Sequence, residues 1–133
     1  MMAQFFDLQD VSHGLNGTRV EDLGQLMTIL NRLAHRRPFG FELIGENGKT
    51  LFIGISLKCG CVQFSSSDGD PPYWVAVAPG EHDLETEGME YLIGRTLTPV
   101  LERHCVSIET LMQIIGHFLA TGDRYRMVSW EEP

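Results

Sequence analysis

The amino-acid sequence predicts an α+β fold, with a mostly antiparallel sheet of about six or seven strands and two amphipathic helices on one face of it. Two segments, one in each half of the chain, repeat apolar residues at helical spacing. Between them, short apolar stretches alternate with polar residues and are joined by brief turn sequences, which is typical of antiparallel strands. No repeat, low-complexity tract or linker divides the chain, so we expect a single domain over residues 1–133.

The N-terminal part is expected to contain a short strand and the first helix. Ala3–Phe6 has strand character, and a glycine-rich loop follows it. Thr18-Arg-Val-Glu21 has the spacing of a capping box, in which a hydroxyl and a carboxylate satisfy free amides at a helix start. An apolar stripe comes next, and Pro38 is expected to end the helix. The stripe comprises Leu23, Leu26, Met27, Leu30, Leu33 and Ala34.

Residues 39–78 are predicted to form a meander of antiparallel strands. The first strand leads into Glu46-Asn-Gly-Lys49, which favours a two-residue hairpin because Asn-Gly accepts positive φ at both turn positions. Alternate residues are apolar in the return strand and in the next one. After the loop SSSDGDPP, a fourth strand is expected over 73–78. The residues expected on the core side of the second and third strands are Leu51, Ile53, Ile55, Leu57, Val62 and Phe64.

The C-terminal part is predicted to hold the second helix between two short strands. Tyr91–Ile93 is expected to be one strand, whereas Pro99 argues against a regular element over 96–104. Ser107 is a suitable N-cap, and Gly122 supplies the positive φ that commonly ends a helix. The last strand is expected over Met127–Glu131. The helix carries one apolar stripe, Leu111, Ile114, Ile115, Phe118 and Leu119.

The charge of the chain limits the partners that it can bind. The formal net charge of −8 and the pI of about 5.0 argue against direct binding of nucleic acid, which requires a basic face. They favour a basic protein partner or none. No apolar run is long enough to span a membrane. The start MMAQFFDLQD lacks the basic and long apolar regions of a secretory signal, so we expect a cytoplasmic protein.

No motif for catalysis or metal binding is present in the sequence. It lacks a glycine-rich phosphate loop, GxSxG, HExxH and the zinc-deaminase signature. The cysteines do not have the spacing of a zinc ribbon, and the histidines are scattered. His104 and Cys105 are adjacent, but neighbours in a strand point to opposite faces. We therefore predict a protein that is not an enzyme and has no catalytic residue, cofactor or metal site.

Acidic and aromatic residues favour the binding of a partner. The segment 68–90 is rich in Asp and Glu and contains no lysine or arginine. On its own, such a segment could be a solvated loop that only aids solubility. Tyr73, Trp74, Tyr91 and Trp130 belong to the residue types that anchor interfaces, although each could equally pack in the core.

Residues 108–132, IETLMQIIGHFLATGDRYRMVSWEE, resemble the C-terminal signature of immunity protein family one of bacterial polymorphic toxin systems. In that family an amphipathic helix ends in a Phe-Leu-Ala-Thr-Gly run, and an arginine and a strand ending in tryptophan and acids follow. Tyr125 stands where a proline usually follows the arginine. The resemblance extends more loosely back to residue 39. The matching residues are Phe118, Leu119, Ala120, Thr121, Gly122, Arg124, Val128, Trp130, Glu131 and Glu132.

The resemblance implies a small cytosolic inhibitor that is encoded beside a toxin and binds it tightly. Members are often paired with nucleic-acid deaminase toxins, including ones similar to cytosine deaminases that act on DNA. Such a toxin needs a basic surface to hold the phosphate backbone, and an acidic protein can occupy that surface. We expect Trp130 to hold the last strand on the sheet, or to belong to the core. The expected contact surface is Asp68, Asp70, Tyr73, Trp74, Glu81, Asp83, Glu85, Glu87, Glu90, Trp130, Glu131 and Glu132.

Two other classes of function remain open on the sequence. One is a small-molecule-binding or enzymatic domain that uses the concave sheet face with a cysteine or a histidine. A pocket that joins Cys59, Cys61 or Cys105 to a histidine would favour it. The other is an acidic interaction domain that binds a partner without silencing a toxin.

Overall fold

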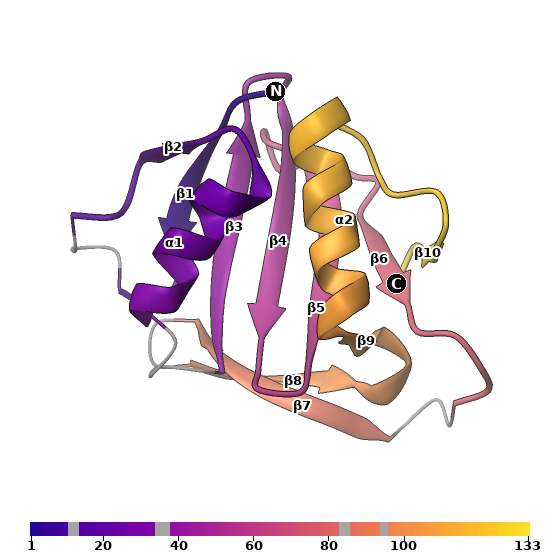
Figure 1. The fold of residues 1–133 in the computed structure, drawn as a ribbon. Coiled ribbons are helices and arrows are strands. Elements are labelled where there is room, and N and C mark those ends of the chain that lie inside the picture. Colours follow the sequence, from indigo (N-terminus) through magenta and orange to yellow (C-terminus); the bar gives the residue numbers. More distant parts are fainter. Residues whose placement is uncertain (11–13, 34–37, 83–85, 94–95) are drawn as a thin grey trace.

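A computed structural model of residues 1–133 describes the whole chain except residues 11–13, 34–37, 83–85 and 94–95 (Figure 1). The described residues form ten strands, two α-helices and one short 3-10 helix. In chain order the elements are β1 (Ala3–Asp7), β2 (Thr18–Val20), α1 (Leu23–Leu33), β3 (Phe39–Gly45), β4 (Lys49–Ile55), β5 (Cys59–Ser66), β6 (Trp74–Val77), β7 (Glu87–Ile93), β8 (Thr96–Leu101), η2 (Glu102–His104), β9 (Val106–Ser107), α2 (Ile108–Thr121) and β10 (Ser129–Glu131).

Seven of the strands form one sheet in the order β10-β6-β5-β4-β3-β1-β2, and all neighbours in this order are antiparallel. The hairpin of β7 and β8 joins the sheet through a single parallel pairing of Phe39 with Leu92. Strand β9 pairs with β5. The α+β class and the mostly antiparallel sheet are therefore confirmed, and strands that the sequence did not predict raise their number.

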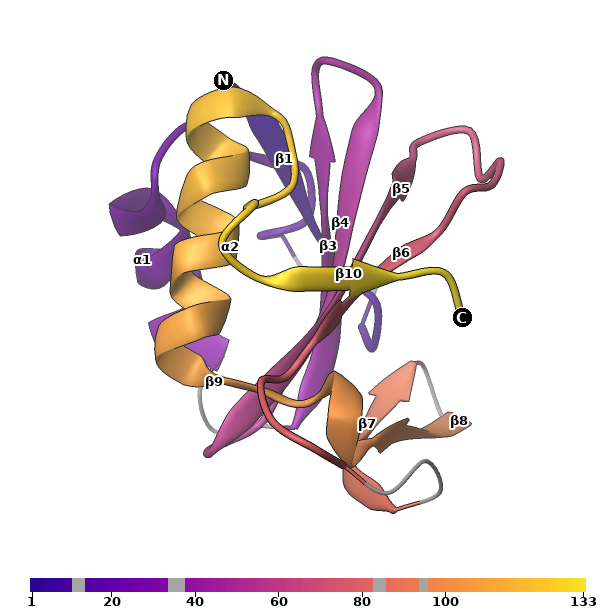
Figure 2. The ribbon, with the colours of Figure 1, turned by 90° about the vertical axis from the view of Figure 1, so that its right-hand side faces the viewer.

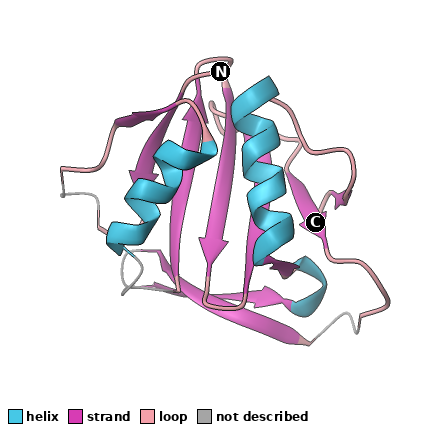
Figure 3. Cartoon of the chain, viewed as in Figure 1, coloured by secondary structure: helices cyan, strands magenta, loops and turns pink. Residues whose placement is uncertain are grey.

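Both helices lie on the same face of this sheet, as Figures 1 and 3 show and as the rotated view of Figure 2 confirms. The main core fills the space between the helices and the sheet. Residues of the predicted helix stripes line this core on one side, and alternate residues of the strands line it on the sheet side. Ala34, assigned to the first stripe, lies outside the described residues. None of the helices in the described part of the chain is long and apolar enough to cross a membrane.

The caps of the two helices differ in how well the sequence predicted them. Ser107 accepts a hydrogen bond from the Thr110 amide at 3.1 Å, and Gly122 ends α2 with a φ of 78°, so both predictions are confirmed. The capping box at Thr18 is wrong, because Thr18 belongs to β2 and pairs with β1. Asp22 instead accepts a hydrogen bond from the Gln25 amide at 2.9 Å, four residues later in the chain than the expected cap.

The hairpin after β3 lies where Asn-Gly predicted it, but its turn is of another type. The connection is Glu46–Gly48, and of these residues only Gly48 has a positive φ, 80°. Such a three-residue connection needs one residue in the left-handed region. Asn47 does not adopt a positive φ, and its side-chain amide donates a 2.9 Å hydrogen bond to the Gly122 carbonyl. The hairpin is thereby tied to the end of α2.

Three further expectations about the strands are wrong. Leu57 is 77% exposed because β4 ends at Ile55 and the chain then turns, with the Ser56 amide bonded to the Cys59 carbonyl at 2.9 Å. The segment 96–101 is a regular strand despite Pro99. Strand β8 pairs only with β7, so a residue without an amide hydrogen is tolerated on its open edge. Strand β7 starts at Glu87, four residues before the expected strand Tyr91–Ile93, and therefore includes Glu87 and Glu90.

Candidate partner-binding surfaces

The fold divides the acidic segment 68–90 into two places. Asp68 and Asp70 lie on the β5–β6 loop, at one end of β6. Glu81, Glu87 and Glu90 follow the other end of β6 and continue into β7 (Figure 2). All five side chains are exposed, whereas Asp83 and Glu85 lie outside the described residues. The expected acidic contact residues therefore lie in two places, with β6 between them.

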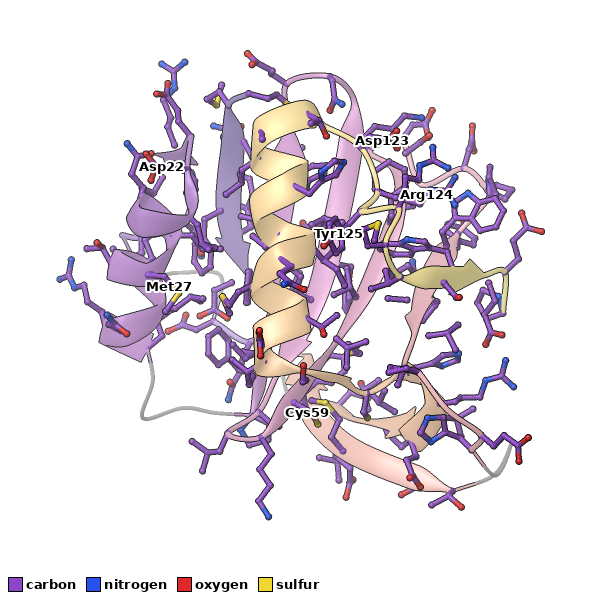
Figure 4. All side chains as sticks on the ribbon, turned by 45° about the vertical axis from the view of Figure 1, so that its right-hand side comes forward. Asp22, Met27, Cys59, Asp123, Arg124 and Tyr125 are labelled. Atoms are coloured by element: carbon purple, nitrogen blue, oxygen red, sulfur yellow. The ribbon has the colours of Figure 1, made fainter. Side chains whose placement is uncertain are left out.

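Trp74 takes part in an interaction within the chain. Its ring packs against the main core, and the Arg124 guanidinium carbon lies 4.2 Å from the ring centroid. The same carbon is 5.9 Å from the centroid of Phe64. Figure 4 shows Arg124 on the connection between α2 and β10. Arg124 thus attaches this connection to the sheet, and Trp74 is less available to a partner than the sequence suggested.

Tyr73, next to Trp74, is exposed. Its hydroxyl donates a hydrogen bond to the carbonyl of Gly69 within the β5–β6 loop, and 38% of its surface is accessible. Tyr73 therefore presents an accessible aromatic ring, the type of side chain that anchors interfaces, at the same end of β6 as Asp68 and Asp70.

Trp130 holds the last strand in place. In β10 it pairs with Ala76 of β6, and its ring packs against the main core. The indole nitrogen donates a 2.9 Å hydrogen bond to the carbonyl of Tyr125. These contacts satisfy the polar atom of a partly buried indole and fix the connection that precedes β10. They agree with the interpretation of Trp130 as a lock on the sheet.

Glu131, which was expected in the contact surface, is paired within the protein. Its two carboxylate oxygens bond to Arg103 and His104, which lie in η2. The hydrogen bond from His104, and then that from Arg103, lower the pKa of Glu131. Glu131 thus connects β10 to η2, while Glu132 is exposed. No sequence pattern indicates this cluster, because Glu131 is far in the chain from Arg103 and His104.

Two glycines place the β7–β8 hairpin against the sheet face that the helices leave uncovered. A Cβ atom on Gly40 would come within 3.0 Å of the Tyr91 ring, and one on Gly54 within 2.8 Å of it. The ring can lie directly on the strands only because both side chains are missing. Around it forms a second cluster of buried residues, separate from the main core, comprising Cys61, Met89, Tyr91 and Val100.

A pocket of about 250 Å³ opens between this hairpin and the sheet. It joins Cys61 to His104, which is the feature named above for a small-molecule or enzymatic function. Burial raises the pKa of the Cys61 thiol to about 11, so the reactive thiolate is scarce near neutral pH. His104 bonds to Glu131. The pocket is lined by Phe52, Cys61, Val62, Gln63, Val75, Tyr91, Pro99, Val100, Leu101, His104 and Pro133.

Beside the pocket, the uncovered sheet face carries Glu42. Its neighbours in β3, Phe41 and Leu43, are fully buried in the main core, so the alternation of the strand directs Glu42 to the opposite face. Partial burial raises the pKa of its carboxyl. No hydrogen bond or ion pair to Glu42 occurs among the described residues. The alternation of the sequence FGFELIG is the signal that could have identified Glu42, because it puts this residue on the face opposite Phe41 and Leu43.

The described side chains offer no evident metal site. Within this part of the chain, no three His, Cys, Asp or Glu side chains are placed to hold a metal ion together. Cys59, Cys61 and Cys105 are all free. Burial raises the pKa of Cys105 to about 12, with Cys59 adding to the effect, so this thiol is also protonated near neutral pH.

In comparisons with known proteins, the chain matches no protein-family model and no curated protein. The resemblance of residues 108–132 therefore rests on its motif alone. In the structure, three motif residues have structural tasks: Gly122 ends α2, Arg124 covers Trp74 and Trp130 holds β10. The motif thus describes how the C-terminal segment packs onto the sheet, and of its two acids only Glu132 is exposed.

Proposed function

We propose that this protein is an immunity protein, which binds a cognate toxin in the cytoplasm and neutralises it. The observation that carries the proposal is a set of exposed carboxylates that have no ion pair among the described residues, in a chain with a net charge of −8. They lie at both ends of β6, on β7 and after β10, and they are Asp68, Asp70, Glu81, Glu87, Glu90 and Glu132. A basic partner would complement this distribution.

The C-terminal motif supports a toxin as that partner, and a nucleic-acid deaminase acting on cytosine is the activity it favours. An enzyme that holds a phosphate backbone needs a basic surface around its active site. An acidic inhibitor can cover that surface and exclude the nucleic acid. Long-range attraction between opposite charges would also speed the encounter, which an antidote requires.

The test is co-expression with the toxin-like reading frame that adjoins this gene. Survival of the cells and recovery of both proteins as a complex are scored together. Rescue accompanied by a stable complex is the expected result. A neighbour that is harmless alone, or one that stays toxic and unbound, would refute the proposal.

The pocket beside Cys61 and His104 favours a second candidate, the binding of a small apolar molecule. Most of its lining is apolar, and His104 and Gln63 supply polar groups. A screen of apolar fragments by changes in amide chemical shifts would test this candidate. Shifts confined to the pocket residues, in a protein that protects against no toxin, would favour it over the immunity protein.

A further inference from the structure

The sheet face away from the helices has a row of residues that lie outside the main core. Phe52, one of them, packs against the second cluster, with its ring centroid 6.1 Å from that of Tyr91. The row runs across five neighbouring strands, from β1 to β6, and each side chain in it is only partly buried. We call it the open row. Its members are Phe6, Glu42, Phe52, Gln63 and Val75.

The register of the strands makes these residues direct neighbours. Phe6 is opposite Glu42, and Glu42 is opposite Phe52. Side chains at directly opposite positions have Cβ atoms about 5 Å apart. The carboxylate of Glu42 therefore stands between two aromatic side chains. That environment removes water from it and raises its pKa, and no cation among the described residues compensates the charge.

The other half of the open row forms part of the pocket. Phe52, Gln63 and Val75 line it, while Tyr91 and Val100 of the β7–β8 hairpin form its opposite wall. In Figure 2 this hairpin projects from the sheet on the side away from the helices. A carboxylate with no partner among the described residues and an apolar pocket thus lie next to each other, with Phe52 between them.

This arrangement is larger than a small ligand requires. Five strands that lie about 4.8 Å apart give the row a length of roughly 19 Å. A segment of a protein can extend along it, insert one apolar side chain into the pocket and place a cation against Glu42. Arginine suits that place better than lysine, because its planar guanidinium stacks on aromatic rings and bonds a carboxylate with two hydrogen bonds.

We propose that the open row is the docking site for an arginine of a partner protein, with a neighbouring apolar residue of that partner in the pocket. This proposal depends on the proposed function in one respect only, the identity of the partner as a toxin with a basic surface. The guanidinium lies between Phe6 and Phe52 and pairs with Glu42. The exposed carboxylates elsewhere on the protein attract the partner, and the open row holds it.

The first experiment needs no toxin. The 15N-labelled protein is titrated with N-acetyl-arginine methylamide and, separately, with its citrulline analogue, which has nearly the same shape but no charge. The arginine compound is expected to shift the amide signals of the open row, and citrulline is not. Glu42→Gln should abolish the response. Absence of a localised response to arginine, or an equal response to citrulline, would overturn the proposal.

The second experiment uses the complex with the product of the adjoining reading frame. Truncating one partner of a buried charge pair acts mainly on dissociation, so Glu42→Gln should increase the dissociation rate at least about 30-fold. The matched control is Glu21→Gln, an exposed glutamate before α1. Glu42→Gln should fold normally, with a melting temperature that is unchanged or higher, because it removes a partly buried charge that no cation in the described part of the chain compensates.

The outcomes separate the two proposals. If the wild-type complex forms and Glu42→Gln dissociates at the wild-type rate, the open row is overturned while the immunity function stands. If the adjoining product neither binds nor kills, the immunity function fails, and the titration with arginine decides whether the open row is a site.

Discussion

The guanidinium carbon of Arg124 lies 4.2 Å from the ring centroid of Trp74, so that a residue after α2 covers a residue at the start of β6. Trp74 also packs against the main core. A cation this close to an indole face, in a partly buried place, stabilises the contact. The relationship explains why an arginine follows the glycine that ends α2: it fastens the connection that leads to β10.

Removal of this cation should destabilise the protein modestly. Arg124→Ala is expected to lower the free energy of unfolding by about 1–2 kcal/mol, because it removes the cation and the packing of its stem. Chemical denaturation followed by tryptophan fluorescence measures the effect. The control is Arg126→Ala, which breaks only an exposed pair with Asp123 and should change stability by less than about 0.5 kcal/mol. Equal effects of the two variants would contradict the role of Arg124.

The pairing of Glu131 predicts how stability depends on pH. Its pKa is lowered in the folded state, so its contribution is complete above the ordinary value of 4.5 and is lost as the pH falls through the folded value. Glu131→Gln should therefore lose stability at neutral pH and show a weaker decline below pH 4.5 than the wild type. Glu132→Gln, at an exposed neighbour, should follow the wild-type curve. Parallel curves for wild type and Glu131→Gln would exclude the proposed linkage.

A methyl group under the Tyr91 ring should displace the β7–β8 hairpin. Gly54→Ala would bring a Cβ within 2.8 Å of both the ring and the Cys61 sulfur. Overpacking of this kind costs about 1–3 kcal/mol, measured as the free energy of unfolding. Gly14→Ala is the control, since nothing lies within 4 Å of its Cβ. The prediction fails if Gly54→Ala is as stable as this control.

The exposed acids should act on the rate of association with the proposed toxin partner. Reversal of Glu81, Glu87 and Glu90 to Lys, with or without Asp83 and Glu85, is expected to slow association about 10-fold at low salt and to weaken its salt dependence. Dissociation should change little, because these side chains are exposed. Binding kinetics at several salt concentrations provide the measurement. The control reverses an equal number of exposed acids on the helix side, and equal slowing there would indicate an effect of net charge alone.

The sequence predicted those features of the fold that depend on local patterns. Ser107 and Gly122 mark the ends of α2 through their own backbone chemistry, and alternate apolar residues identify the buried face of β4 and β5. Thr18 shows the limit of this reasoning. Its spacing to Glu21 suits a helix cap. Thr18 is instead part of β2, because this segment pairs with β1, which is a tertiary interaction that a local pattern does not indicate.

The candidate site was less predictable, because it depends on which residues the sheet brings together. Its acidic composition indicated the segment 68–90 as a contact surface, but β6 lies within this segment and separates its two ends in space. Nothing near Glu131 in the sequence indicates that its carboxylate pairs with Arg103 and His104 of η2. Glu42 was hidden in an ordinary strand, and its importance follows only from its neighbours Phe6 and Phe52 on adjacent strands.

The most direct test of the central claim is a titration of the toxin's own activity. The product of the adjoining reading frame is assayed for the conversion of cytosine to uracil in a single-stranded DNA oligonucleotide, with increasing amounts of this protein. An immunity protein that forms a tight complex should reduce the activity linearly to zero at one equivalent. Deaminase activity that persists in the presence of excess protein would contradict the claim.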